Sequence, residues 1–127
     1  MILPSEAEVV QREVALAFGD PVGVRDPKAL EEALSRPFAA RGGIPVYPTF
    51  FNKLSALLVG LVQARPFAGA NRRTALLVVA LLLRERGYRF SPPAGEVKAL
   101  LQGIELGFTT WHRVTVWLKR HARREIP

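Results

Sequence analysis

The residues from Arg65 to Thr74 combine types and spacings that suit the binding of an anion. Ala68, Gly69 and Ala70 form a loop of small residues in which backbone N–H groups can converge. A helix predicted to start at Asn71 would add its own unpaired N–H groups and the positive end of its dipole. Arg72 and Arg73 then fall in the first helical turn, where the dipole disfavours cations unless an anion is bound. The pattern predicts a phosphate site; the alternative is that both arginines face solvent and bind nothing.

The positive charge of the chain is concentrated around this loop. Residues 33–84 contain seven basic residues and no Asp, Glu or His, whereas residues 1–32 are net acidic and the whole chain carries a formal charge of +7. Such a segment suits phosphate, a nucleotide, nucleic acid or an acidic peptide. The alternative is an apolar core region whose few polar positions are arginines.

Helical periodicity and capping signals predict the elements that hold the loop. Six helices are expected, at residues 5–18, 27–36, 50–64, 71–86, 93–105 and 110–124. Residues 75–83 are apolar on every face, so the helix 71–86 is expected to be the buried central one. Residues 88–90 read as a short connecting strand, and the loop 37–48 is expected to form a short extended flap. The residues of that flap are Ile44, Pro45, Val46 and Tyr47. The predicted fold class is all-α, a single domain spanning residues 1–127 with about six helices around a buried central helix.

Composition excludes several kinds of protein. The absence of Cys excludes a disulfide framework, a thiol nucleophile and a zinc site with Cys ligands. His112 and His121 are too far apart to form a helical ligand pair, so no metal site is predicted. Lys119 to Arg124 form a basic tail without interleaved aromatic residues, which argues against nucleic acid as a partner. No apolar run reaches the length of a membrane span and no leader is visible, so a cytoplasmic location is expected.

The stretch Arg65-Pro66-Phe67-Ala68-Gly69-Ala70-Asn71-Arg72-Arg73 resembles the motif of the Fic/Doc (Fido) superfamily, His-x-Phe-x-Asp/Glu-Gly/Ala-Asn-x-Arg. It is most similar to the death-on-curing (Doc) branch, which continues Asn-Lys-Arg-Thr-Ala. Residues 24–37, 47–53 and 86–88 also resemble that branch, so the resemblance covers about residues 5–120. It implies a Fic/Doc-type helical domain, a role in a toxin–antitoxin system, and transfer of phosphate or AMP from ATP to a protein hydroxyl.

The resemblance implies roles for individual residues of the loop. Ala70 and Asn71 match the turn that cradles phosphate, Arg73 matches the arginine that grips nucleotide phosphates, and Arg72 keeps the charge of the usual Lys. Phe67 matches the aromatic residue that anchors the loop in the core. The flap residues 44–47 would align a target segment beside the site.

Two positions depart from the family motif. Arg65 stands where the family has its general base, His, and a guanidinium cannot accept a proton at working pH. Gly69 stands where the family has the acidic residue that helps to hold Mg²⁺ at the phosphates. A replacement would have to come from elsewhere in space, and the candidates are Asp20, Asp26, Glu96 and Glu105. The motif therefore predicts impaired catalysis and argues against bound Mg²⁺, with ATP as the implied ligand.

Three functions remain open at this point. The first is a Doc-type toxin protein that has lost its catalytic centre and binds phosphate or a partner. The second is an active ATP-dependent protein kinase or AMP-transferase acting on a translation factor such as elongation factor Tu. The third, motivated by charge alone, is a nucleic-acid-binding module. The implied partner is a small antitoxin with an acidic C-terminal segment, which the basic stretch 33–84 would suit.

Overall fold

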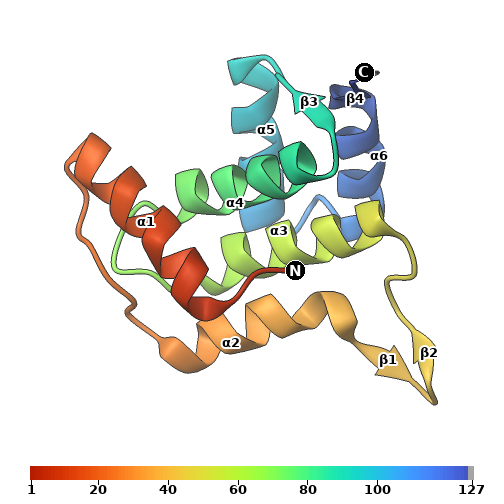
Figure 1. Ribbon diagram of the computed structural model, residues 1–127, viewed down its shortest axis with the longest axis horizontal. Coiled ribbons are helices and arrows are strands. Elements are labelled where there is room, and N and C mark those ends of the chain that lie inside the picture. Colours follow the sequence, from red (N-terminus) through yellow and green to blue (C-terminus); the bar gives the residue numbers. More distant parts are fainter. Residues whose placement is uncertain (126–127) are drawn as a thin grey trace.

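The structure, a computed structural model that describes residues 1–125, is built mainly from helices (Figure 1). The helices are α1 (Pro4–Phe18), α2 (Pro27–Ser35), α3 (Phe50–Ala64), α4 (Asn71–Glu85), α5 (Ala94–Glu105) and α6 (Trp111–His121), with a 3-10 turn at Arg36–Phe38. Two short antiparallel pairs join β1 (Ala40–Arg41) to β2 (Ile44–Pro45) and β3 (Tyr88–Phe90) to β4 (Ala122–Arg124). The all-α class is confirmed. Within residues 1–125, every helix is too short or too polar to span a bilayer.

Helix α3 lies at the centre of the fold. Every residue from Leu54 to Val62 is buried, and α2, α4, α5 and α6 all pack against this helix. Helix α4, by contrast, leaves Leu77 and Leu81 more than a third exposed. The prediction that the helix 71–86 is the central one is therefore wrong. Gly60 has no side chain, and a Cβ built on it would lie 3.5 Å from Ala33. The glycine therefore lets α2 approach α3 closely.

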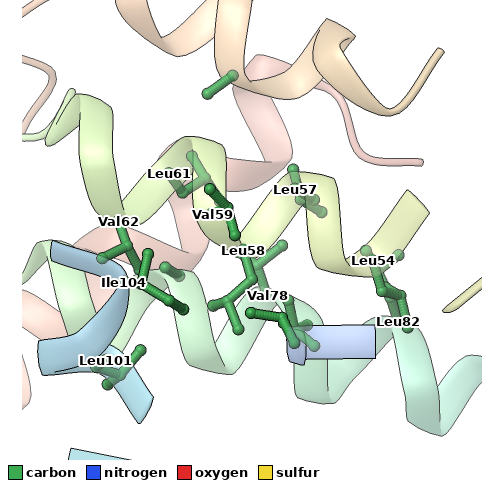
Figure 2. Packing of buried hydrophobic residues seen from close by; sticks show 14 of the residues in the cluster. Leu54, Leu57, Leu58, Val59, Leu61, Val62, Val78, Leu82, Leu101 and Ile104 are labelled. Carbon is green, nitrogen blue, oxygen red and sulfur yellow. The ribbon is translucent and has the colours of Figure 1, made fainter. Parts of the chain in front are cut away.

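All six helices contribute aliphatic side chains to the core, and the residues labelled in Figure 2 come from α3, α4 and α5. Leu58 and Val62 of α3, Val78 of α4 and Ile104 of α5 are all almost completely buried. Burying each such side chain contributes about 1.5–3 kcal/mol. The core thus fixes α3, α4 and α5 relative to one another, and these helices carry most of the candidate site.

Local capping signals set the starts of α2 and α3. The Asp26 carboxylate accepts a hydrogen bond from the Ala29 N–H (3.1 Å), and Thr49 Oγ1 accepts one from the Asn52 N–H (3.0 Å). Such caps satisfy N–H groups that the helix itself leaves unpaired. The first helix starts at Pro4, one residue earlier than predicted, because Glu6 accepts a hydrogen bond from the Leu3 N–H.

The helix predicted at residues 110–124 is shorter in the structure. It ends at His121, and residues 122–124 form β4, which pairs with β3 in the register Tyr88 to Arg124. The Trp117 ring packs against Phe90 of β3, which places the end of α6 beside that strand. Helical periodicity cannot reveal a pairing between segments so far apart in the chain. The pattern therefore predicted that the helix continues through residues 122–124.

Candidate anion-binding cleft

The loop between α3 and α4 is held in an unusual backbone conformation at both ends. Arg65, which ends α3, has φ 48°, and Ala70, which precedes α4, has φ 56°; no other non-glycine residue of the described chain has a positive φ. The left-handed conformation costs about 1–2 kcal/mol per residue with a Cβ. Between them Phe67 is only 1% exposed, so its side chain anchors the loop in the core.

The side chain of Asn71 closes this loop on itself. Its Oδ1 accepts a hydrogen bond from the Phe67 N–H (2.9 Å), and its Nδ2 donates one to the Phe67 carbonyl oxygen (3.1 Å). The Asn71 amide therefore fixes the shape of the loop, in addition to lining the cleft described below.

The segment after α1 clamps the loop from outside. The Pro66 carbonyl accepts hydrogen bonds from the N–H groups of Arg25 (2.8 Å) and Asp26 (3.0 Å), and the Gly23 carbonyl accepts one from Ala68 (2.8 Å). Because these hydrogen bonds join backbone groups, they hold the segment 20–26 and the loop 65–70 together whatever the side chains.

Gln11 is a residue of the site that the sequence predictions missed. Its side chain is buried in α1; Nε2 donates to the carbonyls of Pro21 (2.9 Å) and Gly69 (3.1 Å), and Oε1 accepts from the Gly23 N–H (3.0 Å). The sequence could have indicated this role, because Gln11 lies on the same helix face as the apolar residues Ala7 and Val14. A polar residue on an apolar face needs buried partners.

A cleft of about 890 Å³ opens where the loop, the first turn of α4 and helix α5 meet. Its lining residues are Asp20, Arg65, Ala68, Gly69, Ala70, Asn71, Arg72, Arg73, Leu76, Ala94, Val97, Lys98, Leu101 and Glu105. The structure therefore brings together Arg65 and the whole run 69–73 that the motif singled out. It also adds cleft residues from α5 that no motif had indicated.

The arginines of the first turn of α4 have carboxylate neighbours from distant parts of the chain. Arg72 donates two hydrogen bonds to the Glu105 carboxylate, which lowers the pKa of Glu105 and raises the pKa of Arg72. The Arg73 guanidinium lies 3.9 Å from the centre of the Phe18 ring, and its Nη1 lies 3.6 Å from Asp20 Oδ2. Of the four replacement carboxylates considered from the sequence, two thus reach the cleft.

The other two carboxylates are used elsewhere. Asp26 caps α2, and Glu96, in the first turn of α5, lies 2.6 Å from His121 Nε2. Within residues 1–125, no three His, Asp or Glu side chains come together in a way that could hold a metal ion by themselves.

Gly69 stands where a side chain cannot be accommodated. A Cβ built on it would lie 2.7 Å from Pro21 Cδ, 3.1 Å from Pro21 N and 3.2 Å from Pro21 O. Real Cβ atoms do not approach other atoms so closely, so any other residue at this position requires the segment 20–23 to move.

The start of α4 has the features of an anion site. Its N-cap residue is Ala70, which has no side chain to accept hydrogen bonds from the N–H groups of the first turn. Those groups and the helix dipole favour an anion at this point. Arg65, Arg73 and Lys98 add positive charge along the cleft.

The predicted flap lies away from the cleft. The β1–β2 hairpin sits at the opposite end of α3 from the loop 65–70 (Figure 1), and a helix of α3's length spans about 22 Å. Ile44 is 71% exposed there, whereas Tyr47 is buried and its hydroxyl accepts a hydrogen bond from Arg36. Residues 44–47 do not line the cleft, so the expectation that they lie beside the site is not met.

Comparison with known proteins gives two matches. The sequence model described as "Fic/DOC family" matches residues 4–83, which include α1 to α3, the whole loop and all but the last two residues of α4. A protein of Mycolicibacterium smegmatis named Toxin Doc is 32% identical over 77 residues, which cover 61% of this chain. The match spans 59% of that relative's own length, less than two thirds of it.

Proposed function

The chain belongs to the Fic/DOC family, and from that premise we propose that it is a Doc-like toxin-type protein whose cleft binds nucleotide phosphate but whose catalysis is impaired. The similarity to a Toxin Doc supports the toxin part of this proposal. The cleft at the start of α4 supports the binding part, since it contains the matched residues Ala70, Asn71 and Arg73.

ATP phosphates fit the residues at the start of α4. The uncapped first turn offers N–H donors, and Asn71 holds the loop that presents them. Arg73 is the cation we expect to contact phosphate, since its ion pair with Asp20, at 3.6 Å, is looser than the hydrogen-bonded pair of Arg72 with Glu105. Arg72, by contrast, is already bound to Glu105 and would serve to hold α5 against α4.

The proposal that catalysis is impaired rests on the residues at positions 65 and 69. Arg65 lines the cleft as a guanidinium, which cannot take a proton from an attacking hydroxyl. Gly69 provides no carboxylate, and Pro21 occupies the space that one would need. Glu105 is a weak substitute base, because its bond to Arg72 lowers its pKa.

The proposal is tested by label transfer from γ-labelled ATP to elongation factor Tu, measured beside ATP binding by calorimetry. We expect the native chain to bind ATP without transferring label, and Arg65→His to transfer it, because a positioned base contributes about 10²–10⁴ in rate. Histidine tolerates the left-handed backbone at position 65. The control is Arg65→Lys, which keeps the charge and supplies no neutral base. Transfer by the native chain contradicts the impairment, and absence of ATP binding contradicts the nucleotide site.

A second candidate is an active ATP-dependent kinase or AMP-transferase. It is favoured by the two carboxylates, Asp20 and Glu105, which line the same cleft and could take the proton in place of histidine. In that case the native chain transfers label, and Asp20→Asn or Glu105→Gln abolishes the transfer.

The partner we propose is a small antitoxin with an acidic segment. Supporting this, Arg65, Arg73 and Lys98 line the cleft, and an apolar groove of about 490 Å³ adjoins it at Arg73, Leu76 and Val97. An acidic segment with apolar side chains would match both parts. A synthetic peptide of that kind should compete with ATP for the native chain and bind Arg73→Ala more weakly; equal binding to both proteins contradicts the proposed location.

A further inference from the structure

We propose that this cleft binds nucleotide phosphates without a divalent cation, and that Arg65 and Lys98 supply the positive charge that a metal ion would otherwise provide. The inference rests on the proposed nucleotide binding and deepens it. It assigns a phosphate-binding role to Arg65, whose guanidinium cannot act as a base, and to Lys98 of α5, which lies outside the motif loop.

The cleft contains more positive than negative side chains. Its basic residues are Arg65, Arg72, Arg73 and Lys98, and its carboxylates belong to Asp20 and Glu105. The two carboxylates pair with Arg73 and Arg72. Arg65 and Lys98 form no ion pair with a carboxylate of the described residues 1–125, so the cleft keeps a surplus of two positive charges. Such a surplus in one cleft is relieved when an anion binds there.

Backbone contacts fix Arg65 where it lines the cleft. It ends α3 in the left-handed conformation, with φ 48°, and Arg25 donates a hydrogen bond to its carbonyl oxygen. The pKa of Glu105 is lowered mainly by the hydrogen bonds from Arg72 and additionally by the charge of Arg65. The positive charge of Arg65 therefore acts across the cleft on the end of α5, in the space that a phosphate would enter.

Lys98 extends the positive charge along α5. It lies on the same side of this helix as Leu101 and Glu105, which also line the cleft. A rise of about 1.5 Å per residue separates Lys98 from Glu105 by about 10 Å along the helix. Since Arg72 lies at Glu105, positive charge is present at both ends of this wall, which suits a chain of phosphates better than a single one.

The same residues do not fit Mg²⁺, which commonly binds through one or two carboxylates beside the phosphates. Glu105 already accepts two hydrogen bonds from Arg72, and Asp20 Oδ2 lies 3.6 Å from Arg73 Nη1. A divalent cation would have to displace a guanidinium from its carboxylate. It would also add to the surplus of positive charge, which is unfavourable.

The test is ATP binding by calorimetry in EDTA and in Mg²⁺, for the native chain, Arg65→Gln, Lys98→Gln and the control Lys28→Gln. Lys28 is an exposed residue of α2 that does not line the cleft, so its variant removes the same charge outside the site. We expect the native chain to bind ATP in EDTA at least as tightly as in Mg²⁺, because the metal ion neutralises part of the phosphate charge.

The variants should separate in EDTA. Arg65→Gln and Lys98→Gln should each weaken ATP binding about five- to tenfold, since each removes a charge-assisted contact with phosphate. Lys28→Gln should weaken it by less than about twofold, because solvent and salt screen a charge outside the cleft. Arg65→Lys, which keeps the charge, should retain most of the affinity. Thermal melts check that each of these variants at exposed positions is folded.

Two results would overturn this inference and leave the proposed nucleotide site intact. If Mg²⁺ tightens ATP binding by the native chain, a metal ion contributes to holding the phosphates. If either cleft variant binds ATP as well as Lys28→Gln does, the side chain it lacks faces solvent and binds nothing. A native chain that binds ATP in neither buffer would instead overturn the proposed function, and this inference with it.

Discussion

The guanidinium of Arg72, in the first turn of α4, donates two hydrogen bonds to the carboxylate of Glu105, at the end of α5. Both residues line the cleft, so their ion pair ties the start of α4 to the end of α5 there. Both side chains remain partly exposed, at 43% and 23%, and solvent therefore weakens the attraction.

The pair predicts a stability that depends on pH. Glu105→Gln should cost about 1 kcal/mol in free energy of unfolding at pH 7, a value typical of a well-formed but partly exposed pair. Because the pKa of Glu105 is lowered in the folded chain, this contribution is complete above the ordinary Glu value of about 4.3 and is lost as pH falls through the folded value. Urea unfolding at pH 7 and in acid checks this, with the exposed Glu31→Gln as control. An equal cost at both pH values would contradict it.

The contact between Gly69 and Pro21 predicts that even the smallest side chain is destabilising at position 69. Gly69→Ala should lower the free energy of unfolding by about 1–3 kcal/mol, because its Cβ forces the segment 20–23 to shift. Gly95→Ala in α5 is the control, since a Cβ there meets no described atom within 4 Å and alanine favours helix. Thermal melts should show a lower Tm for the first variant and an unchanged or higher one for the second. Equal Tm values would mean that the two segments separate easily.

Because the amide of Gln11 is buried and hydrogen-bonded, truncating this side chain should cause a large loss of stability. Gln11→Ala leaves the carbonyls of Pro21 and Gly69 and the N–H of Gly23 without their partner, which should cost about 2–4 kcal/mol. Gln102→Ala, at an exposed position of α5, should change stability by less than about 0.5 kcal/mol. Chemical unfolding compares the two. A small loss for Gln11→Ala would show that water replaces the amide without penalty.

The left-handed backbone of Ala70 predicts a stabilising substitution. Ala70→Gly should raise the free energy of unfolding by about 1 kcal/mol, because glycine adopts a φ of 56° without the Cβ penalty. Ala68→Gly lies two residues away without a positive φ and should lower stability by about 0.5–1 kcal/mol through chain entropy. Opposite shifts in Tm support the account, and a fall in both variants contradicts it.

Local signals were sufficient for much of the fold. The helix predicted at residues 50–64 has those bounds in the structure, because Thr49 caps its start and Pro66 excludes its continuation. Both signals lie within a few residues of the helix ends, where sequence patterns act directly. The strand β4 lacked such a signal, since its partner β3 lies far away in the chain.

The candidate site divides in the same way. The loop and the start of α4 were predictable from one continuous stretch, 65–73. The residues that complete the cleft, Asp20 and Glu105, come from just after α1 and from the end of α5, and only the packing of α1 against α4 and of α5 against α3 brings them there. The hairpin β1–β2 was expected beside the loop, but the length of α3 separates the two.

The contacts of Asn71 predict that stability and ATP affinity rank the variants Asn71→Ala and Asn71→Asp in opposite orders. Asn71→Ala removes both hydrogen bonds to Phe67, whereas Asn71→Asp keeps the acceptor for the Phe67 N–H and loses only the donor. The aspartate also suits the helix start, where the dipole favours negative charge. The alanine variant should therefore be the less stable one, by about 1 kcal/mol.

ATP binding should rank the same two variants the other way. Aspartate at position 71 places a negative charge where phosphate is proposed to bind, so Asn71→Asp should bind ATP more weakly than Asn71→Ala despite its higher stability. Unfolding in urea and calorimetric titration with ATP, on the same protein samples, measure both orders. If stability and affinity instead fall together, the contribution of Asn71 is to the fold of the loop alone. If both variants lose ATP binding equally while stability is unchanged, the Asn71 amide itself contacts the ligand, and the bracing role inferred from its bonds to Phe67 is wrong.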